Sequence, residues 1–366
     1  MKMKNNNKGI TLVALVITII ILLILAGITI ASLRSSGLFS AAQDAKTKTE
    51  EKTEEENTIL EEYEDAITEQ VTGKKPLKPL ETNKKYESKA ELKDANGNKI
   101  VVPAGFKIVS DATTNNATTV DQGIVIEDAT GTDTNGSQFV WIPVGDIKKA
   151  DGTTTSIALN RYSFDSNGVA TEFTSTDFIE EDKTNTTSLK NYGNTISENI
   201  NSFKTSVATN GGFYIGRYEA RKSSSGKLTT VKTDSVWNDI TQPNAATNSK
   251  NMYSTGVTSE LMNSYAWDTA TLFLQTFGGN NKYSRQNSLN NGSVETTGTD
   301  NDKQCNVYDM ASNVREWTTE TYSDSSFPCT YRGGYYDSSN NCTSIRLINS
   351  TSISLSGVGF RPLLFL

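Results

Sequence analysis

The residues best suited to chemistry gather in one short segment near residue 310. Asp309, Asn313 and Glu316 place two carboxylates and a side-chain amide in what we expect to be a tight turn. Together with backbone carbonyls, hard oxygen ligands at this spacing suit Ca²⁺. The alternative is that Glu316 accepts backbone N–H groups and fixes the turn without an ion. Arg332 and Arg361, both near glycines, are expected to pair with carboxylates such as Asp309 or Glu316.

Composition excludes several other reaction classes. The chain has no histidine, so it cannot form a Ser-His-Asp or Cys-His couple or a histidine-based zinc or iron site. A formal net charge of −7 argues against a phosphate-binding surface, and nucleic acid is not expected as a partner. Of the cysteines, Cys329 and Cys342 could pair outside a cell and leave Cys305 as a thiol, Cys305 could take part instead, or none could be bonded.

The C-terminal segment 321–366 has the composition of a binding surface. It contains no Glu, Lys, Gln, Met or Trp, and 335–356 is rich in Ser, Tyr, Asn, Thr and Ile. Tyr, Ser and Asn are typical of adaptable paratopes, because they combine rigid aromatic area with flexible hydrogen bonding. The alternative is a strand pair that closes the domain, which we expect of the alternating core candidates Ile345, Leu347, Ile353 and Leu355. We assign ligand binding to Tyr335, Tyr336, Asp337, Ser338, Asn340 and Asn341.

Every residue type in 335–356 can be encoded by a codon that ends in a pyrimidine. Substitution of adenines in Asn codons would produce this outcome. In this respect the segment resembles the variable region of proteins targeted by diversity-generating retroelements. The resemblance implies a ligand-binding surface at the end of a C-type-lectin-like fold.

An apolar segment, Ile10 to Ala31, lies near the N-terminus. It carries no charge, and as a helix it would be about 33 Å long, enough to cross a bilayer core. Lys2, Lys4 and Lys8 precede it, so the positive-inside rule places the N-terminus in the cytoplasm and the rest outside. We expect a single-pass protein of a bacterial cell membrane with an extracellular C-terminal domain. The alternatives, a secretory signal peptide and a buried core helix, fit less well because the apolar run is long and an acidic stretch follows it.

The junction Lys8-Gly9-Ile10-Thr11-Leu12-Val13 resembles the cleavage site of type IV prepilins. The resemblance implies that a prepilin peptidase cuts after Gly9 and leaves Ile10 as the new N-terminus. The family usually has Glu at the fifth mature position, where it pairs with a neighbouring subunit's N-terminal amine, and this chain has Ala14 there. Assembly with other pilins, a processed membrane anchor and an uncleaved anchor therefore stay open.

The rest of the chain divides by composition. Residues 35–72 carry apolar side chains at helical spacing among Glu, Lys and Thr, which predicts a helical stalk. Gly73, Pro76 and Pro79 interrupt this pattern. Beyond them, short apolar runs between polar loops predict strands near 100–109, 123–126, 138–145 and 211–220, and a helix over 259–277. The expected fold class is α+β, with a leader (1–9), a transmembrane helix and stalk (10–72), a linker (73–99) and a loop-rich domain (100–366).

Five motifs carry a family resemblance that covers about residues 100–366. In chain order they are FVWIPVG from Phe139, GGFYIGRYEA from Gly211, NVYDMASNVREWT from Asn306, RGGYY from Arg332 and GFRP from Gly359. This order is similar to that of the formylglycine-generating enzyme (sulfatase-modifying factor) family. The resemblance implies an elaborated C-type-lectin-like fold. It also implies a calcium turn with Glu316 as the side-chain ligand and Asn313 and Val314 as neighbours.

The same resemblance implies a copper oxidase, but the metal ligands are missing. The family holds copper with two cysteines after its RGG motif, and the corresponding positions are Ser338 and Thr343, with Cys342 one place away. A thiolate pair for Cu(I) is therefore absent. Relatives that use non-haem iron need histidines. We expect neither copper nor iron and no catalysis by either route.

Together these features predict a membrane-anchored, pilin-like surface protein. Its C-terminal domain is expected to bind an extracellular ligand, a protein or a glycan, without catalysis. Two hypotheses compete with this one. The protein could be a minor pilus subunit whose C-terminal domain only decorates the filament, or it could be a divergent enzyme of the sulfatase-modifying factor family.

Overall fold

The computed structural model describes residues 12–35, 38–73, 76–110, 118–180, 200–232, 234–286, 292–299, 302–337 and 342–366. The chain divides into two units, Met1–Pro76 and Leu77–Leu366. The predicted leader and its junction, Gly9 and Ile10, lie outside the described residues, as do Ser338, Asn340 and Asn341.

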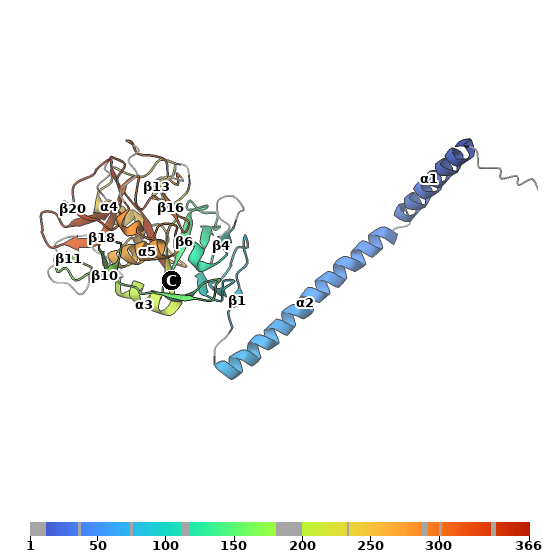
Figure 1. Ribbon diagram of the computed structural model, residues 1–366, viewed down its shortest axis with the longest axis horizontal. Coiled ribbons are helices and arrows are strands. Elements are labelled where there is room, and N and C mark those ends of the chain that lie inside the picture. Colours follow the sequence, from blue (N-terminus) through green and yellow to red (C-terminus); the bar gives the residue numbers. More distant parts are fainter. Residues whose placement is uncertain are drawn as a thin grey trace, which may run out of the picture. The chain divides into compact units, whose positions relative to one another are not determined.

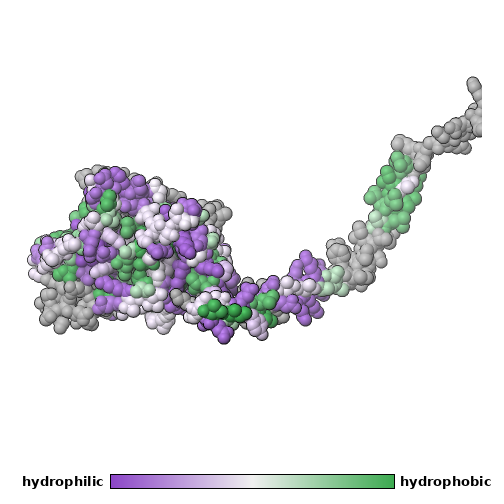
Figure 2. Space-filling model, turned by 60° about the horizontal axis from the view of Figure 1, so that its bottom comes forward, coloured by the Kyte–Doolittle hydropathy of each residue, from purple (hydrophilic) through white to green (hydrophobic). Residues whose placement is uncertain are grey.

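Two helices make up the described part of the first unit, α1 (Leu12–Ser35) and α2 (Leu38–Thr72). Side chains in α1 are described for 15–26, and all of them are exposed; their hydrophobic surface is visible in Figure 2. α2 is predominantly polar, with exposed apolar side chains in its second half at Ile59, Leu60, Tyr63, Ile67 and Val71. A search of the described residues finds no helix with both the length and the apolarity of a membrane span.

The second unit consists of short strands and long loops around a few helices (Figure 1). Its helices are α3 (Ile200–Asn210), α4 (Gln242–Lys250) and α5 (Ser264–Phe277), with short 3₁₀ helices η1 (Val120–Gln122) and η3 (Tyr283–Arg285). The strands are β1 (Lys78–Pro79), β2 (Ala90–Lys93), β3 (Lys99–Val102), β4 (Phe106–Val109), β5 (Val125–Asp128), β6 (Gln138–Pro143), β7 (Gly145–Lys148), β8 (Thr154–Ile157), β9 (Tyr162–Phe164), β10 (Ala170–Glu172), β11 (Phe178–Ile179), β12 (Gly212–Gly216), β13 (Arg221–Lys222), β14 (Leu228–Thr229), β15 (Thr258–Leu261), β16 (Lys303–Gln304), β17 (Val307–Tyr308), β18 (Arg315–Tyr322), β19 (Cys329–Arg332), β20 (Arg346–Asn349), β21 (Val358–Phe360) and β22 (Pro362–Phe365).

A six-stranded antiparallel sheet, in the order β15-β22-β12-β6-β5-β4, separates two hydrophobic cores. Along β12, Phe213 and Ile215 belong to one core and Tyr214 to the other. Side chains alternate between the faces of a strand, and the strand predicted near 211–220 is confirmed. Because β12 is covered on both faces, all five of its residues are buried.

Helices cover the first face of this sheet, and a mixed layer covers the second. α3 contributes Phe203 and α5 contributes Trp267 to the core that contains Phe213. The core on the other face receives Ala245 from α4 and Trp317 from β18. β18 is the central strand of a second sheet, in the order β11-β18-β19-β20, with β21 added in parallel to β18.

The structure differs from the sequence expectations in three places. The helix expected over 259–277 begins only at Ser264, because Asn263 accepts a hydrogen bond from the Ala266 amide at 2.8 Å as its N-cap, while 258–261 pair with β22. The expected linker 73–99 contains β1 and β2, and Leu92 is buried in the domain core. In the tail, β20 pairs with β19, whereas Ile353 and Leu355 lie outside any strand and pack half-buried against the core.

Candidate functional site

A fixed turn, 309–314, forms the base of the candidate site. Asp309 and Asn313 have φ values of 64° and 58°, in the left-handed region that Asp and Asn tolerate better than other non-glycine residues. The Asn313 side chain accepts a hydrogen bond from the Glu295 amide at 2.9 Å and donates one to Glu219 Oε2 at 2.6 Å. Glu219 also accepts from the Val314 amide. The turn is therefore held from two sides by buried polar groups.

The tyrosine loop, residues 333–337, lies directly on this turn. The Tyr336 amide donates to the Asn313 carbonyl at 2.9 Å, and the Gly334 amide donates to the Met310 carbonyl at 3.3 Å. A Cβ on Gly334 would lie 1.9 Å from the Ala311 carbonyl oxygen. Gly333 has a φ of 88°. Both glycines of the RGG motif are thus required by the backbone, one by the close approach and one by its conformation.

The loop carries two aromatic rings next to a cation. The ring centroids of Tyr335 and Tyr336 are 4.5 Å apart, and the Arg315 guanidinium lies 4.2 Å from the centroid of Tyr335. Both tyrosines and Arg315 are half-buried, whereas Asp337 is exposed. A hydrogen bond to the Tyr336 side chain, together with burial, raises the pKa of Tyr335. The arrangement combines aromatic area, a cation and a carboxylate, which suits recognition of a partner surface.

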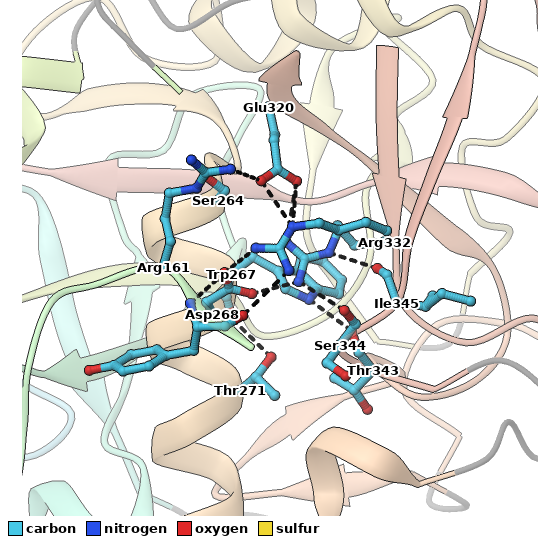
Figure 3. A network of polar contacts seen from close by, with 12 residues as sticks. Arg161, Ser264, Trp267, Asp268, Thr271, Glu320, Arg332, Thr343, Ser344 and Ile345 are labelled. Atoms are coloured by element: carbon cyan, nitrogen blue, oxygen red, sulfur yellow. Dashed lines mark hydrogen bonds and ion pairs between the residues drawn. The ribbon is translucent and has the colours of Figure 1, made fainter. Parts of the chain in front are cut away.

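The chain is fixed again immediately after the segment 338–341. Trp267 Nε1 donates to the Thr343 carbonyl at 2.9 Å, and the Thr343 hydroxyl donates to the Tyr283 carbonyl at 2.9 Å. Arg332 Nε donates to the Ile345 carbonyl at 2.7 Å (Figure 3). The described residues that precede and follow 338–341 are thus both held by hydrogen bonds to the domain.

Arg332 belongs to a buried arginine network, which consists of Arg161, Arg332, Arg346, Asp268 and Glu320. Figure 3 shows Arg161, Arg332, Asp268 and Glu320. Arg332 Nη2 lies 2.5 Å from Asp268 Oδ1, and Arg346 Nη2 contacts the other oxygen of Asp268. Glu320 Oε1 lies 2.5 Å from Arg161 Nη2 and 3.0 Å from Arg346 Nε. The two carboxylates and Arg332 are fully buried, so each charge depends on its partners.

The electrostatics of this network favour the ionised form of Glu320. Burial opposes ionisation of Glu320, but Arg346, Arg332 and Arg161 together outweigh it and lower the pKa of Glu320. Burial also lowers the pKa of Arg332. Nearby, burial raises the pKa of Glu180 to about 7, although it accepts hydrogen bonds from the Ser264 amide and the Thr319 hydroxyl.

The predicted calcium residues lie close together, and each has a protein partner. Glu316 accepts hydrogen bonds from Arg361, 2.7 Å from Nη2 to Oε1 and 3.1 Å from Nε to Oε2. The pairing of Arg361 with Glu316 agrees with the sequence expectation, whereas Arg332 pairs with Asp268 instead. Burial raises the pKa values of Glu219 and Asp309 well above their ordinary ranges. Among the described residues, no group of three or more Cys, Asp or Glu side chains could hold a metal ion, and the calcium site stays a prediction.

The cysteines do not form a copper site of the family type. Cys305, Cys329 and Cys342 are all thiols, and burial raises the pKa values of Cys305 and Cys329 to about 12. Thr343, at one of the two copper positions, uses its hydroxyl to bond the Tyr283 carbonyl. A hydroxyl is not the soft thiolate ligand that Cu(I) selects. The described residues therefore do not fit a copper site of this type.

Several residues of this site were not identified from the sequence. Four charged residues of the arginine network come from separate segments: Arg161, Asp268, Glu320 and Arg346. In the sequence, each of them alone looks like an ordinary charged surface residue. Arg315 offered a signal, because it lies inside the NVREW motif directly before Glu316. Its aromatic partner, Tyr335, was already a candidate.

Curated proteins and solved structures were compared with the chain, and neither comparison identifies its family. No curated protein matches the chain. Among solved structures, it is similar to CarF (14% identity, TM-score 0.31, 42% of this chain and 87% of that one). It is also similar to Treponema denticola variable protein 1 (14%, 0.27, 64% and 98%) and to a Major Tropism Determinant M1 variant (10%, 0.32, 78% and 83%). At these TM-scores, none of the three likenesses supports a conclusion about this chain.

The family model gives the decisive match. The model of the FGE-sulfatase family, described as a sulfatase-modifying factor enzyme 1-like domain, matches residues 130–363. The mixed α+β, loop-rich and sheet-rich domain fits the C-type-lectin-like fold of this family, as the sequence predicted. The matched range contains both sheets' central strands, the 309–314 turn and the tyrosine loop. The chain therefore belongs to the FGE-sulfatase family.

Proposed function

We propose that this protein is a non-catalytic binding protein whose FGE-sulfatase domain recognises an extracellular ligand through the tyrosine loop and the residues that follow it. One observation carries the proposal. The loop is held on the 309–314 turn by two backbone hydrogen bonds, yet it leaves Tyr335, Tyr336 and Asp337 accessible. Function in proteins is often located on loops that a rigid scaffold positions.

The preorganised loop lowers the entropic cost of binding. Immobilising a side chain on association costs about 0.5–1.5 kcal/mol, and a surface that is already ordered avoids part of this cost. Tyr335 already contacts Tyr336 and Arg315 before any ligand arrives. Tyr and Arg are also the residue types most enriched among the dominant contacts of interfaces.

The chemistry of the site favours binding over catalysis. The chain lacks histidine, and Thr343 stands where the oxidases of this family have a copper-binding cysteine. The FGE-sulfatase family includes enzymes, so this part of the proposal needs a direct test. The full chain, supplied with Cu(I), should leave a cysteine-containing peptide unoxidised; formation of a formylglycine product would overturn the non-catalytic assignment.

A membrane anchor completes the proposal. The basic residues before Ile10, the uncharged run to Ala31 and the exposed apolar side chains of α1 support insertion into a bacterial cell membrane. The junction at Gly9 and Ile10 supports processing by a prepilin peptidase. The extracellular placement of the domain follows from the same orientation, and assembly with other pilins is a further expectation of this model.

The tail composition supports diversification of the binding surface by a retroelement. This idea predicts a reverse transcriptase and an Asn-codon-rich template repeat next to the coding sequence. A genomic neighbourhood without either of them would remove this part of the proposal. The binding role itself would stand, because it rests on the geometry of the loop.

Binding can be tested on an array of purified extracellular proteins and glycans probed with the full chain. We expect at least one target that the wild type binds and the Tyr335→Ser/Tyr336→Ser variant does not. Tyr63→Ser is the matched control, because Tyr63 is an exposed tyrosine of α2, 66% accessible and outside the domain. An array on which no target distinguishes the loop variant from the wild type would contradict the proposal.

A further inference from the structure

A pocket lies beside the C-terminal segment, on the side of the domain that α4 covers. The α4 pocket has a volume of about 390 Å³ and is lined by Trp237, Asp239, Thr241, Asn244, Asn248 and Ser354, together with one apolar residue. Its volume falls within the range of about 300–1,000 Å³ that is typical of small-molecule sites. Ser354 belongs to the tail, whereas the other residues come from the turn before α4 and from α4 itself.

The walls of the α4 pocket are fixed by hydrogen bonds behind it. The Trp237 amide donates to the Ala220 carbonyl at 2.8 Å, and the Asp239 amide donates to the Leu355 carbonyl at 3.2 Å. Trp317 Nε1 donates to the Ile240 carbonyl at 2.9 Å. Asp239 has a φ of 51°, a strained conformation that these contacts maintain. The pocket is therefore preformed.

Several polar groups line the α4 pocket. Thr241 occupies the N-cap position of α4, but its hydroxyl makes no capping hydrogen bond. The side chains of Asp239, Asn244 and Ser354 are exposed, so water hydrates them and a ligand would take its place. Together they offer a carboxylate, an amide and two hydroxyls. A ligand that both donates and accepts hydrogen bonds would satisfy all four groups.

The chemistry of the α4 pocket fits a neutral sugar better than an ion. No Lys or Arg lines the pocket among the described residues, and Asp239 would repel an anion. Lys222 already places its ammonium 5.3 Å from the Trp237 ring centroid, which disfavours a second cation there. Trp237 is half-buried and supplies an apolar ring surface beside the polar groups. Sugar rings have this combination of C–H faces and hydroxyls that both donate and accept.

We propose that the α4 pocket is a binding site for a neutral hexose or N-acetylhexosamine unit of a glycan. The site goes beyond the function proposed above, because it uses none of the residues of the tyrosine loop and does not require that function. The indole packs against one face of the sugar. Asp239 accepts hydrogen bonds from sugar hydroxyls, and Asn244, Thr241 and Ser354 complete the set.

Tryptophan fluorescence reports on this site selectively. The chain has four tryptophans, and Trp141, Trp267 and Trp317 are fully buried, so a soluble quencher reaches mainly Trp237. The full chain is titrated with glucose, galactose, mannose and N-acetylglucosamine up to about 50 mM, which covers millimolar Kd values. We expect at least one sugar to protect Trp237 saturably from acrylamide quenching.

Two variants and a control separate binding from misfolding. Asp239→Asn keeps the shape and tolerates the positive φ, and it should weaken sugar binding by about tenfold or more, the loss expected for a hydrogen bond to a charged group. Asn244→Ala removes an exposed neutral amide and should weaken binding by about two- to tenfold. Thr247→Ala, on α4 but outside the pocket, should bind as the wild type does. Absence of protection by all four sugars, or equal affinity in Asp239→Asn, would overturn the proposal. Because the readout is Trp237 and not the tyrosine loop, either proposal can fail while the other stands.

Discussion

The buried arginine network should be essential for the stability of the domain, and Asp268→Asn tests this. Asp268 is fully buried and accepts from Arg332 at 2.5 Å, from Arg346 and from the Tyr162 amide at 3.0 Å. Asparagine keeps the shape but removes the charge, and its NH₂ group would face one of these donors. Glu320 would then be the single remaining carboxylate for three arginines.

The expected loss is large because a buried charge is left without its partner. Breaking a buried ion pair by removing one member costs about 3–5 kcal/mol. For the domain Leu77–Leu366, such a loss lowers Tm by roughly 5–8 °C. The decrease should be measured by thermal and denaturant unfolding of the full chain, followed by tryptophan fluorescence, since Trp267 lies 5.7 Å from the Arg332 guanidinium.

Two further variants distinguish the charge effect from a general effect of substitution. Asp133→Asn replaces an exposed aspartate, and we expect a change within about 0.5 kcal/mol. Asp268→Asn/Arg346→Met removes one charge of each sign, so its loss should be smaller than the sum of the single losses by about 1–3 kcal/mol. The reasoning is refuted if Asp268→Asn behaves like Asp133→Asn, or if the double variant is strictly additive.

Three other outcomes follow from the same structure. The pKa of Glu180 is raised from 4.5 to about 7, so the folded state holds this proton more tightly than the unfolded state. Relative to Glu180→Gln, the unfolding free energy of the wild type should therefore fall by up to about 3 kcal/mol between pH 4.5 and 7 and then level off. Parallel pH profiles of the two proteins would contradict this. Gly334→Ala would place a Cβ 1.9 Å from the Ala311 carbonyl oxygen, so hydrogen exchange of the Tyr336 amide should accelerate. Gly279→Ala, whose Cβ would lie 3.9 Å from Gln304 Oε1, should leave this exchange rate unchanged. In cells, the full chain should stay with membranes during alkaline carbonate extraction and a chain without 10–31 should not; equal release of both would argue against the anchor.

The alternation of side chains in β12 and the fold implied by the five motifs could be predicted from the sequence, because the strand pattern and each motif are short and local. Phe213 and Tyr214 enter different cores as a two-residue period requires. The start of α5 could not be placed, since Leu261 and Met262 continue its apolar pattern although residues 258–261 form β15. There, pairing with β22 and the Asn263 cap outweigh the local periodicity.

The candidate site was predictable where it is contiguous in sequence and not where it is assembled from distant segments. The RGGYY motif identified Tyr335 and Tyr336, and the two glycines have the backbone role that their type suggests. Nothing local indicates that Arg161 meets Glu320 across the domain. The same holds for the α4 pocket, which joins Ser354 to Asp239 only through tertiary contacts.

The affinity of the tyrosine loop for a target recovered from the array tests the central claim most directly. Calorimetry with the full chain should show that Tyr335→Ser/Tyr336→Ser weakens binding by about 100-fold or more. Each truncated aromatic contact costs at least ~1.4 kcal/mol, which raises Kd about tenfold, and the two factors multiply. Tyr63→Ser should bind as the wild type does. A Kd for the loop variant within twofold of the wild-type value, in a protein that still unfolds at the wild-type temperature, would contradict the account.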